Sequence, residues 1–540
     1  MPQATFQVDQ EIYREKISTA IIRHNYPFMF VEHEGIRDLH SFLNPTVKPI
    51  TRNTAKSDVL KLYKRERDKL KHVIESIPSR ICLTSDLWSS IATDGYLALT
   101  AHYVDENWIL QKKILSFHHM PPPHSGPILV EKRHLSLTDT LFCGGEFFHV
   151  RCGAHILNLI VQAGLKVIDE AVNKIRESVK YVRVSEGRKI KFAECIAQLS
   201  LSCSKKVCQD VPTRWNYTYL MIDGALMYRR AFDQLQLIDV HFKTCPSDDE
   251  WVKVENIAKF LKPFYDITTL FSGFHYPTAN LYFHGVWKIQ MLIKEEIRNS
   301  CDAISSMAKQ MKEKFDKYWE CYSVVLSFAI ILDPRYKLQF VEFCFKKLYP
   351  ATYVDRVKFI RDKLYMLFEE YMCLSSISTS NQSSVACASG GDNIGDEMDE
   401  FDIYESQHYG LTRNKSQLDL FLEEQKFDRK QDLDILTYWK ANKLRYLELA
   451  LMARDILSIP ITTVASESAF SIGSQILNKY RSSIVPKNAE ALLCTRDWLY
   501  EKGNIKFSNE DEEDEELAED FESIITTLKN SSNDSHSSFS

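Results

Sequence analysis

The hydrophobic pattern of the first third of the chain changes from helical to strand-like. Apolar side chains recur at helical spacing over residues 11–24 and again over residues 55–75. Three runs rich in β-branched, aromatic and other apolar residues follow, with turn residues between them. These runs cover residues 80–85, 96–104 and 108–117. The pattern predicts two helices followed by an antiparallel meander of three strands.

The rest of the chain is mainly helical in pattern. A short strand is predicted at residues 147–151, where it should join the same sheet, and an amphipathic helix at 152–165. Residues 375–414 are rich in Ser, Gly and acidic residues, so they cannot bury much apolar surface and are predicted to be a disordered linker. Helical patterns return at residues 433–458, 463–480 and 488–500.

These changes of pattern divide the chain into six regions. They are an N-terminal helical region at 1–78, a strand-containing region at 79–170, a long helical region at 171–374, the linker at 375–415, a C-terminal helical region at 416–502 and an acidic, Ser-rich tail at 503–540.

Composition places the chain among ordinary globular proteins and excludes several classes. Its 540 residues are 44% hydrophobic and 26% charged, and a net charge of −6 gives no global basic signal. Any contact with nucleic acid must therefore come from local patches. The 13 cysteines form no CxxC pair, so neither a disulfide framework nor a zinc site is expected. The start lacks a signal-peptide pattern, and the longest apolar run, at 322–332, is shorter than the roughly 20 residues needed to span a membrane.

One predicted helix carries a basic face. Lys61, Lys64, Arg65 and Arg67 lie in the stretch LYKRERDKLK and could contact phosphates. Acidic residues interrupt the positive charges, however, and mixed-sign faces are common on exposed helices. The favoured interpretation of this stretch is a solvated helix face.

Four short motifs carry the candidate chemistry. They are LTSDLWSS at Asp86, HVRCGAHILNLIV at Cys152 and His155, DVPTRWN at Arg214 and Trp215, and TTVASESAFS at Glu467. Taken singly, each has an ordinary explanation. An Asp after a strand is usually a turn or cap residue, a Glu in the first turn of a helix is a capping residue, a Cys and a His at a helix start are a buried thiol and a terminal histidine, and a Trp is a core residue.

Taken in order, the four motifs resemble the hAT transposase superfamily, in its plant RICESLEEPER/DAYSLEEPER branch. The resemblance covers residues 10–370 and 415–502. It implies a mixed α/β fold that is predominantly α. An RNase H-like core would be interrupted by a large helical insertion and followed by a C-terminal dimerisation region. It also implies a nuclear protein whose partners are DNA and a second copy of itself, with no membrane role.

The resemblance also implies an incomplete catalytic site. Members of the family cut DNA with three carboxylates, which hold two Mg²⁺ ions for in-line displacement. Asp86 and Glu467 match two of them, whereas the segment carrying the third is missing between residues 117 and 152. Asp139 is the only Asp in that interval, and its context does not match, so it is given no catalytic role. Asp86 and Glu467 are therefore expected to be vestigial and to bind a metal only if a residual Mg²⁺ site exists; no cofactor is expected.

Other residues take their expected roles from the resemblance alone. Cys152, His155, Arg214 and Trp215 would lie near bound DNA, with the indole stacking on an extruded base. The residues expected to support dimerisation are Trp439, Leu449, Leu457 and Phe470. Relatives often begin with a BED zinc finger, and its Cys and His pairs are absent from this sequence, so sequence-specific DNA reading is expected to be lost.

The sequence thus predicts a transposase-derived, domesticated nuclear protein that binds DNA, forms dimers and does not cut DNA. Two alternatives remain. The first is an active cut-and-paste transposase in which another carboxylate completes the site. The second is a protein-interaction scaffold that does not bind DNA.

Overall fold

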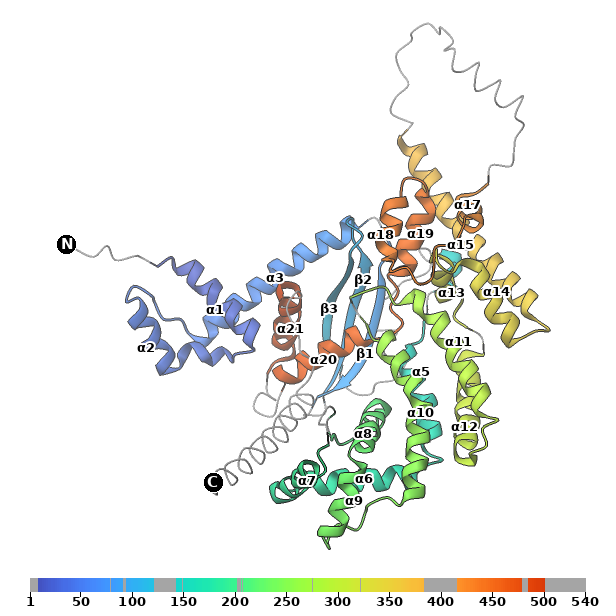
Figure 1. The fold of residues 1–540 in the computed structure, drawn as a ribbon. Helices are drawn as coiled ribbons and strands as arrows, with labels where there is room; N and C mark the ends of the chain where they lie inside the picture. The colour runs from blue at the N-terminus through green and yellow to red at the C-terminus, as the bar shows by residue number, and fades with distance from the viewer. Residues whose placement is uncertain are drawn as a thin grey trace, which may run out of the picture. The chain divides into compact units, whose positions relative to one another are not determined.

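The computed structural model divides the chain into two compact units. The first comprises Met1–Val150, Phe274–Phe283 and Ser323–Gly503, and the second comprises Arg151–Gly273 and His284–Tyr322 (Figure 1). The structure describes residues 8–500 except 78, 91–93, 121–141, 148, 202–204, 206, 274, 321, 383–414 and 478–483. Asp139, most of the predicted linker and the acidic tail lie outside the described residues.

The first unit begins with the predicted helices. Its elements are α1 (Gln10–His24), the 3-10 helix η1 (Phe28–Glu32), α2 (Glu34–Leu43) and α3 (Arg52–Ser76). Asp9 accepts hydrogen bonds from the first backbone N–H groups of α1, and Thr51 does the same for α3. The two helices predicted from hydrophobic spacing, α1 and α3, are confirmed.

The predicted meander is also confirmed. Strands β1 (Cys82–Ser89), β2 (Gly95–Val104) and β3 (Leu110–Met120) form one antiparallel sheet in the order β1-β2-β3. β1 continues four residues beyond the predicted end at residue 85. Asp86 therefore lies within the strand, opposite Ala98, and not at its end.

The prediction of a strand at residues 147–151 is wrong. The described residues of this segment form no ladder with the sheet. The 3-10 helix η2 (Phe142–Gly145) turns the chain here, with positive φ at Cys143 and Gly144. The ring of Phe147 packs on Phe328 of α13 (Val324–Ile331), with ring centroids 5.6 Å apart. The apolar side chain of Phe147 thus finds a helix as its packing partner.

Helices from the second half of the chain complete the first unit. They are α13, α14 (Lys337–Leu348), α15 (Tyr353–Gln382), α17 (Gln417–Glu423), α18 (Ile435–Asn442), α19 (Leu447–Leu457), α20 (Val464–Ile476) and α21 (Pro486–Tyr500). The helical region predicted at 433–458 is two helices, α18 and α19.

The last two helices pack directly on the sheet. α20 packs on all three strands, and α21 packs between β3 and α3 (Figure 1). One hydrophobic cluster joins residues of α1 and α3, of the strands and of these two helices. The core of the first unit is therefore built from segments that lie more than 340 residues apart in the sequence.

A β-bulge shows how closely α21 fits β3. The pairing of β2 and β3 shifts so that Leu99 faces Ser116 and Thr100 faces Ile114, which leaves Leu115 without a partner residue. At the bulge, the backbone N–H of Ile114 donates to the Asp497 carboxylate at 2.9 Å, and the indole N–H of Trp498 donates to the Ile114 carbonyl at 2.8 Å. Burial raises the pKa of Asp497, while its hydrogen bond to Ile114 and the nearby lysines oppose this shift.

The named elements of the second unit are all helices, joined by turns and loops. Its elements are α5 (Gly153–Leu165), α6 (Asp169–Arg183), α7 (Glu186–Gln198), α8 (Trp215–Met227), α9 (Arg229–Ile238), α10 (Asp248–Phe271), most of α11 (Ala279–Glu296) and α12 (Asp302–Trp319). At the crossing of α5 and α12, a Cβ on Gly164 would lie 2.7 Å from the Met311 side chain, so a larger residue at this position would force that side chain to move. Among the described helices of the whole chain, none is long and apolar enough to cross a membrane.

Because Asp497 is the acceptor for the Ile114 N–H at the bulge, we expect Asp497→Ala to lower the free energy of unfolding by about 1–3 kcal/mol, the usual cost of an unsatisfied buried donor. Asp497→Asn should lose less, since one oxygen remains. The matched control is Asp68→Ala, because the Asp68 carboxylate is 55% exposed and only 3.8 Å from Arg67. Urea denaturation measures all three variants. Equal losses for Asp497→Ala and Asp68→Ala would contradict the role given to Asp497.

Candidate carboxylate site and nucleic-acid interface

Asp86 and Glu467 lie on elements that pack against each other. On β1, alternate residues point to one face, so Thr84, Asp86 and Trp88 share a side of the sheet. α20 covers this side: Ser466 contacts Thr84, and the ring of Phe470 stacks on Trp88 with centroids 5.9 Å apart. Asp86 is therefore flanked on the strand by two residues that contact α20, and Glu467 directly follows Ser466 on the helix.

A buried hydrogen-bonded cluster fixes the start of α20 to the sheet. The Thr84 hydroxyl lies 2.8 Å from Nε2 of His102 and 3.0 Å from the Ser466 hydroxyl. The Ser466 hydroxyl also donates to Thr100 at 3.4 Å. All four side chains are buried. The cluster positions the helix turn that carries Glu467 relative to the strand that carries Asp86.

His102 is neutral in this cluster. Burial, with a smaller contribution from Lys112, lowers its pKa to about 3. A neutral imidazole has one nitrogen that accepts and one that donates, so it can join the hydroxyl network without a counter-ion. His102 is thus a packing and hydrogen-bonding residue at physiological pH.

The two carboxylates differ in their surroundings. Asp86 is half-buried, and one of its oxygens accepts the backbone N–H of Leu87 at 2.8 Å. Glu467 is exposed in the first turn of α20. Within the residues that the structure describes, no group of three or more His, Cys, Asp or Glu side chains could hold a metal ion.

In the second unit, α5 holds the DVPTRWN segment. Residues 211–214 form a tight turn, with the Arg214 N–H donating to the Val211 carbonyl at 2.8 Å. Asn158 of α5 accepts from the Trp215 N–H at 3.3 Å and donates to the Thr213 carbonyl at 3.4 Å. One turn further along α5, Gln162 donates to the Pro212 carbonyl at 2.9 Å. The second and third motifs are thus joined by side chains of one helix face.

A buried ion pair supports the same turn from behind. Asp210 has no exposed side-chain surface. The single Nε–H of Arg176 on α6 is shared between the two carboxylate oxygens of Asp210, at 2.9 and 3.1 Å, and Nη2 of Arg176 donates to the same carboxylate at 2.8 Å. The hydroxyl of Thr218 on α8 donates to Asp210 at 3.1 Å. Removing one partner of such a pair leaves a buried charge uncompensated, so the pair holds the turn strongly in place.

The four predicted DNA-contacting residues differ in how exposed their side chains are. His155 and Arg214 are exposed, and His155 lies three residues before Asn158 on the face of α5 that holds the turn. Cys152 is the half-buried N-cap residue of α5. Trp215, in contrast, is only 2% exposed, which corresponds to the alternative interpretation of this residue as a core tryptophan.

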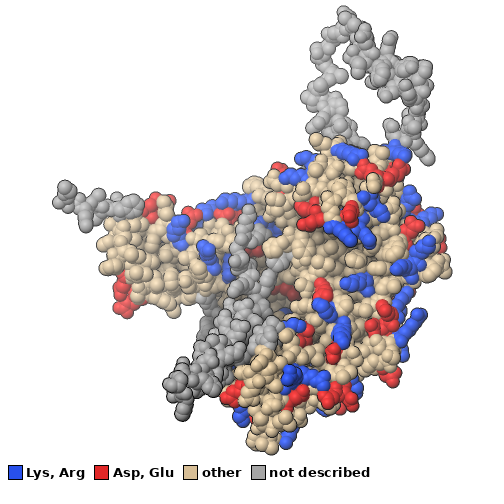
Figure 2. Space-filling view, viewed as in Figure 1, with Lys and Arg blue, Asp and Glu red and all other residues tan. Residues whose placement is uncertain are grey.

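The basic face of α3 is largely engaged in ion pairs with its own chain. Arg65 contacts Glu15 at 2.6 Å and Glu66 at 3.0 Å. Lys61 lies 3.9 Å from Asp58, and Arg67 lies 3.8 Å from Asp68. Lys64 is exposed. Such ion pairs are typical of a solvated helix face that carries charges of both signs. Figure 2 likewise shows Lys and Arg side chains interspersed with Asp and Glu on the face in view.

The four residues predicted to support dimerisation are buried in their own chain. Trp439 and Leu449 have no exposed surface, Leu457 is 1% exposed and Phe470 is 7% exposed. The indole N–H of Trp439 donates to the Leu332 carbonyl of α13 at 3.1 Å. These side chains pack the C-terminal helices onto the first unit. The apolar residues of this region that a partner could reach are others, notably Leu444, Leu447 and Leu451.

Several residues that position the motifs escaped sequence reasoning. They are Thr84, His102 and Ser466 at the strand–helix junction, and Asn158, Gln162, Arg176 and Asp210 around the turn. A usable signal existed for Asn158 and Gln162, which are polar residues four apart in the otherwise apolar run HILNLIVQAG. The partners of Thr84 and Asp210 are distant in sequence and gave no such signal.

Comparison with known proteins agrees with this architecture. Family models match in four places: the ZBED1 RNase-like domain at residues 84–140, the ZBED1 RNase-like helical domain at 150–260, the hAT-like transposase RNase-H fold at 280–371 and the hAT family C-terminal dimerisation region at 417–499. The third and fourth matches confirm the expected RNase H-like fold and C-terminal region.

Whole-chain relatives extend the similarity. The zinc finger BED domain-containing protein RICESLEEPER 3 of Oryza sativa subsp. japonica is 34% identical over 92% of this chain and 71% of its own length. DAYSLEEPER of Arabidopsis thaliana, also named as a zinc finger BED domain-containing protein, is 32% identical over 91% of this chain and 74% of its own length. The putative AC transposase of Zea mays is 34% identical over 92% of this chain and 66% of its own length. With motifs, fold and long-range identity in agreement, the chain belongs to the hAT family of transposase-like proteins, together with the RICESLEEPER and DAYSLEEPER proteins.

Proposed function

We propose that this protein is a transposase-derived nuclear protein that binds DNA, associates with itself and does not cut DNA. The observation that supports DNA binding is the turn held on α5, which carries the exposed Arg214 on the face of α5 that also carries the exposed His155. A guanidinium on a rigid turn suits a phosphate, because its donors are fixed before binding. Binding of this kind is expected to depend on salt and only weakly on sequence.

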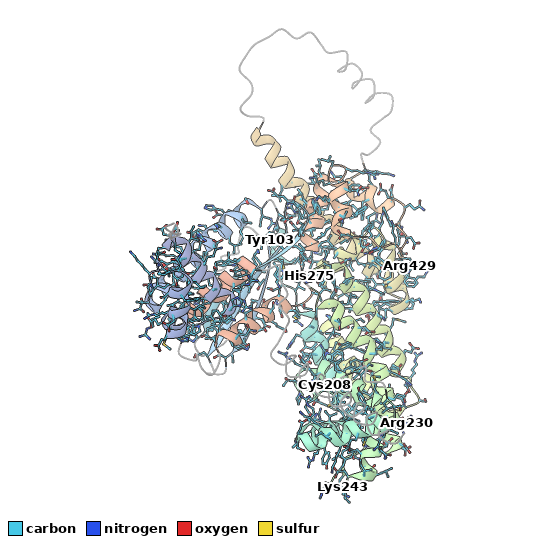
Figure 3. All side chains as sticks on the ribbon, turned by 60° about the vertical axis from the view of Figure 1, so that its left-hand side comes forward. Tyr103, Cys208, Arg230, Lys243, His275 and Arg429 are labelled. Atoms are coloured by element: carbon cyan, nitrogen blue, oxygen red, sulfur yellow. The ribbon has the colours of Figure 1, made fainter. Side chains whose placement is uncertain are left out.

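The proposal predicts a specific effect at Arg214. Arg214→Ala should weaken binding to duplex DNA several-fold and reduce the slope of log affinity against log salt by about one, the effect of one lost phosphate contact. Arg230→Ala is the matched control, since Arg230 is an exposed arginine elsewhere in the second unit (Figure 3). Fluorescence anisotropy over a salt series measures both variants.

Two outcomes would count against this assignment. Equal effects of the two substitutions would mean that Arg214 has no special contact. No measurable binding of the unaltered chain at low salt would favour the alternative, a protein-interaction scaffold without DNA binding.

The proposal that the protein does not cut DNA rests on the number of carboxylates that match the catalytic residues of the family. Asp86 and Glu467 are carried by elements in direct contact, which is the one observation that favours the rival interpretation as an active transposase. Two-metal phosphoryl chemistry nevertheless needs a further bridging carboxylate. We therefore propose that the protein requires no cofactor, with Mg²⁺ relevant only if a residual site forms.

We expect no nicks or hairpins when the protein is incubated with Mg²⁺ or Mn²⁺ and a supercoiled plasmid carrying candidate terminal repeats. The reason is that neither ion would be positioned for in-line displacement. Gel electrophoresis of the plasmid provides the measurement. Cleavage that disappears in Asp86→Ala would establish the active transposase instead, and Asp139→Ala would then be the first variant to test for the completing carboxylate.

Self-association is proposed to use the exposed side of the C-terminal region. Leu447 and Leu451 lie four residues apart on α19, Leu444 lies in the turn just before this helix, and the three are 55%, 39% and 81% exposed, respectively. Such a strip of leucines on the surface is typical of an interface. Trp439, Leu449, Leu457 and Phe470 would then support the interface from beneath by holding α18, α19 and α20.

Placing a charge in this strip should separate the copies. We expect Leu447→Asp to shift the mass measured by light scattering from dimer toward monomer, because a carboxylate would be buried in an apolar contact. Val252→Asp is the control, as Val252 is 52% exposed on α10 of the second unit. A monomeric unaltered chain, or a dimer that survives Leu447→Asp, would contradict the proposed surface.

A further inference from the structure

The hairpin formed by α14 and α15 in the first unit carries basic side chains to which no role has been given above. The two helices pack against each other and are joined by a turn at residues 349–352 (Figure 1). Lys346 and Lys347 lie in the last turn of α14, and Arg356 is the fourth residue of α15. The two lysines are exposed and the arginine is half-buried. These three residues are called the hairpin-tip cations.

Each hairpin-tip cation lies over an aromatic ring of the same hairpin. A ring beneath a cation attracts the charge and leaves the N–H groups of the cation available as donors. The side chain is then held in place before any partner binds. The distances from the charged group to the ring centroid are 5.8 Å for Lys346 over Tyr353, 4.9 Å for Lys347 over Phe343 and 4.1 Å for Arg356 over Tyr349.

No carboxylate of the described chain neutralises these charges. Within residues 8–500, apart from the gaps given above, no Asp or Glu oxygen lies within 4.0 Å of a hairpin-tip cation. Lys363, further along α15, differs in this respect, because its ammonium lies 2.7 Å from Glu146. Residues 342–358 include four basic and two acidic residues, which leaves a net charge of +2 on this part of the hairpin.

The hairpin differs from an ordinary solvated helix face such as that of α3. On α3, the ammonium groups of Lys61, Lys69 and Lys71 lie 3.9, 2.9 and 3.7 Å from carboxylates of the same helix. At the hairpin, the C-terminus of α14 favours the two lysines. Arg356, however, lies near the N-terminus of α15, the end of a helix where a cation is unfavourable. An anion from outside the chain would compensate this charge.

We propose that the hairpin-tip cations bind the phosphates of duplex DNA and form a DNA-binding surface of the first unit. This rests on the proposed function, DNA binding, and adds a surface that can be tested separately from Arg214 in the second unit. Phosphates follow one another along a duplex, so a group of exposed cations can contact neighbouring phosphates without reading bases. An acidic polypeptide suits the surface less well, since each ring already has a cation over one face.

The test uses the full chain and a labelled DNA duplex of arbitrary sequence. In the variant Lys346→Gln/Lys347→Gln/Arg356→Gln, the three charges are removed and the stems of the side chains remain. We expect the affinity to fall at least about ten-fold. The slope of log affinity against log salt should fall by about three, one for each lost phosphate contact. Fluorescence anisotropy over a salt series gives both quantities.

The matched control is Lys61→Gln/Lys69→Gln/Lys71→Gln, which removes the same charge from ion-paired residues of the same unit. It should change the affinity by less than about three-fold and the slope by less than about one, because these charges are already compensated. The comparison separates a local contact from the general effect of net charge. Circular dichroism checks that both variants are folded.

Three results would overturn the proposed surface. The first is an equal effect of the two triple variants. The second is unchanged binding by the hairpin variant while Arg214→Ala weakens it, in which case DNA binding stands without this surface. The third is a polyglutamate chain that binds as tightly as the duplex and is lost in the hairpin variant, which would make the partner an acidic protein.

The same assay distinguishes failure of this surface from failure of the proposed function. If the unaltered chain does not bind the duplex at low salt, DNA binding falls and this surface falls with it. If the hairpin variant binds weakly and Arg214→Ala binds normally, the surface stands and the role given to Arg214 falls.

Discussion

The packing of α20 and α21 on the three-stranded sheet is the contact on which the first unit depends. A small antiparallel sheet with an apolar face is marginal in water until another element covers that face. Here the covering helices come from the far end of the chain, and they reach the sheet with Ser466, Phe470, Asp497 and Trp498. The N-terminal third and the C-terminal helices therefore have to fold together, with the helices of the second unit and α13 to α19 between them in sequence.

The same packing brings together the two elements that carry Asp86 and Glu467. α20 is fixed by hydroxyl groups and a neutral histidine at one end and by aromatic stacking and a glycine at the other. A Cβ on Gly473 would lie 3.0 Å from the Phe117 ring, so this position keeps the helix close to the sheet. The contacts are those of a stable core, and they persist whether or not the carboxylates act on DNA.

Much of this fold could be predicted from the sequence, because its elements have strong local patterns. The three strands, α1, α3 and the helical character of the second unit followed from hydrophobic spacing. The predicted strand at 147–151 failed because Phe147 and its neighbours have strand-like composition, yet Phe147 packs on a helix residue, Phe328, that no local pattern reveals. The role of the C-terminal apolar residues was difficult for the same reason. Trp439 and Leu449 look alike whether they pack in their own chain or against a second copy, and only the tertiary contacts distinguish these cases. The bulge at Leu115 and its partner Asp497 could not be foreseen, since nothing near either residue specifies the other.

The most direct test of this account is hydrogen exchange in β1, β2 and β3 of a chain that ends at residue 414, with and without a separately expressed fragment of residues 415–503. We expect the backbone amides of the three strands to lose their protection in the shortened chain, because α20 and α21 no longer cover the sheet. We also expect the added fragment to restore protection. Strands that remain fully protected without the fragment would contradict the claim that the two ends of the chain form one core.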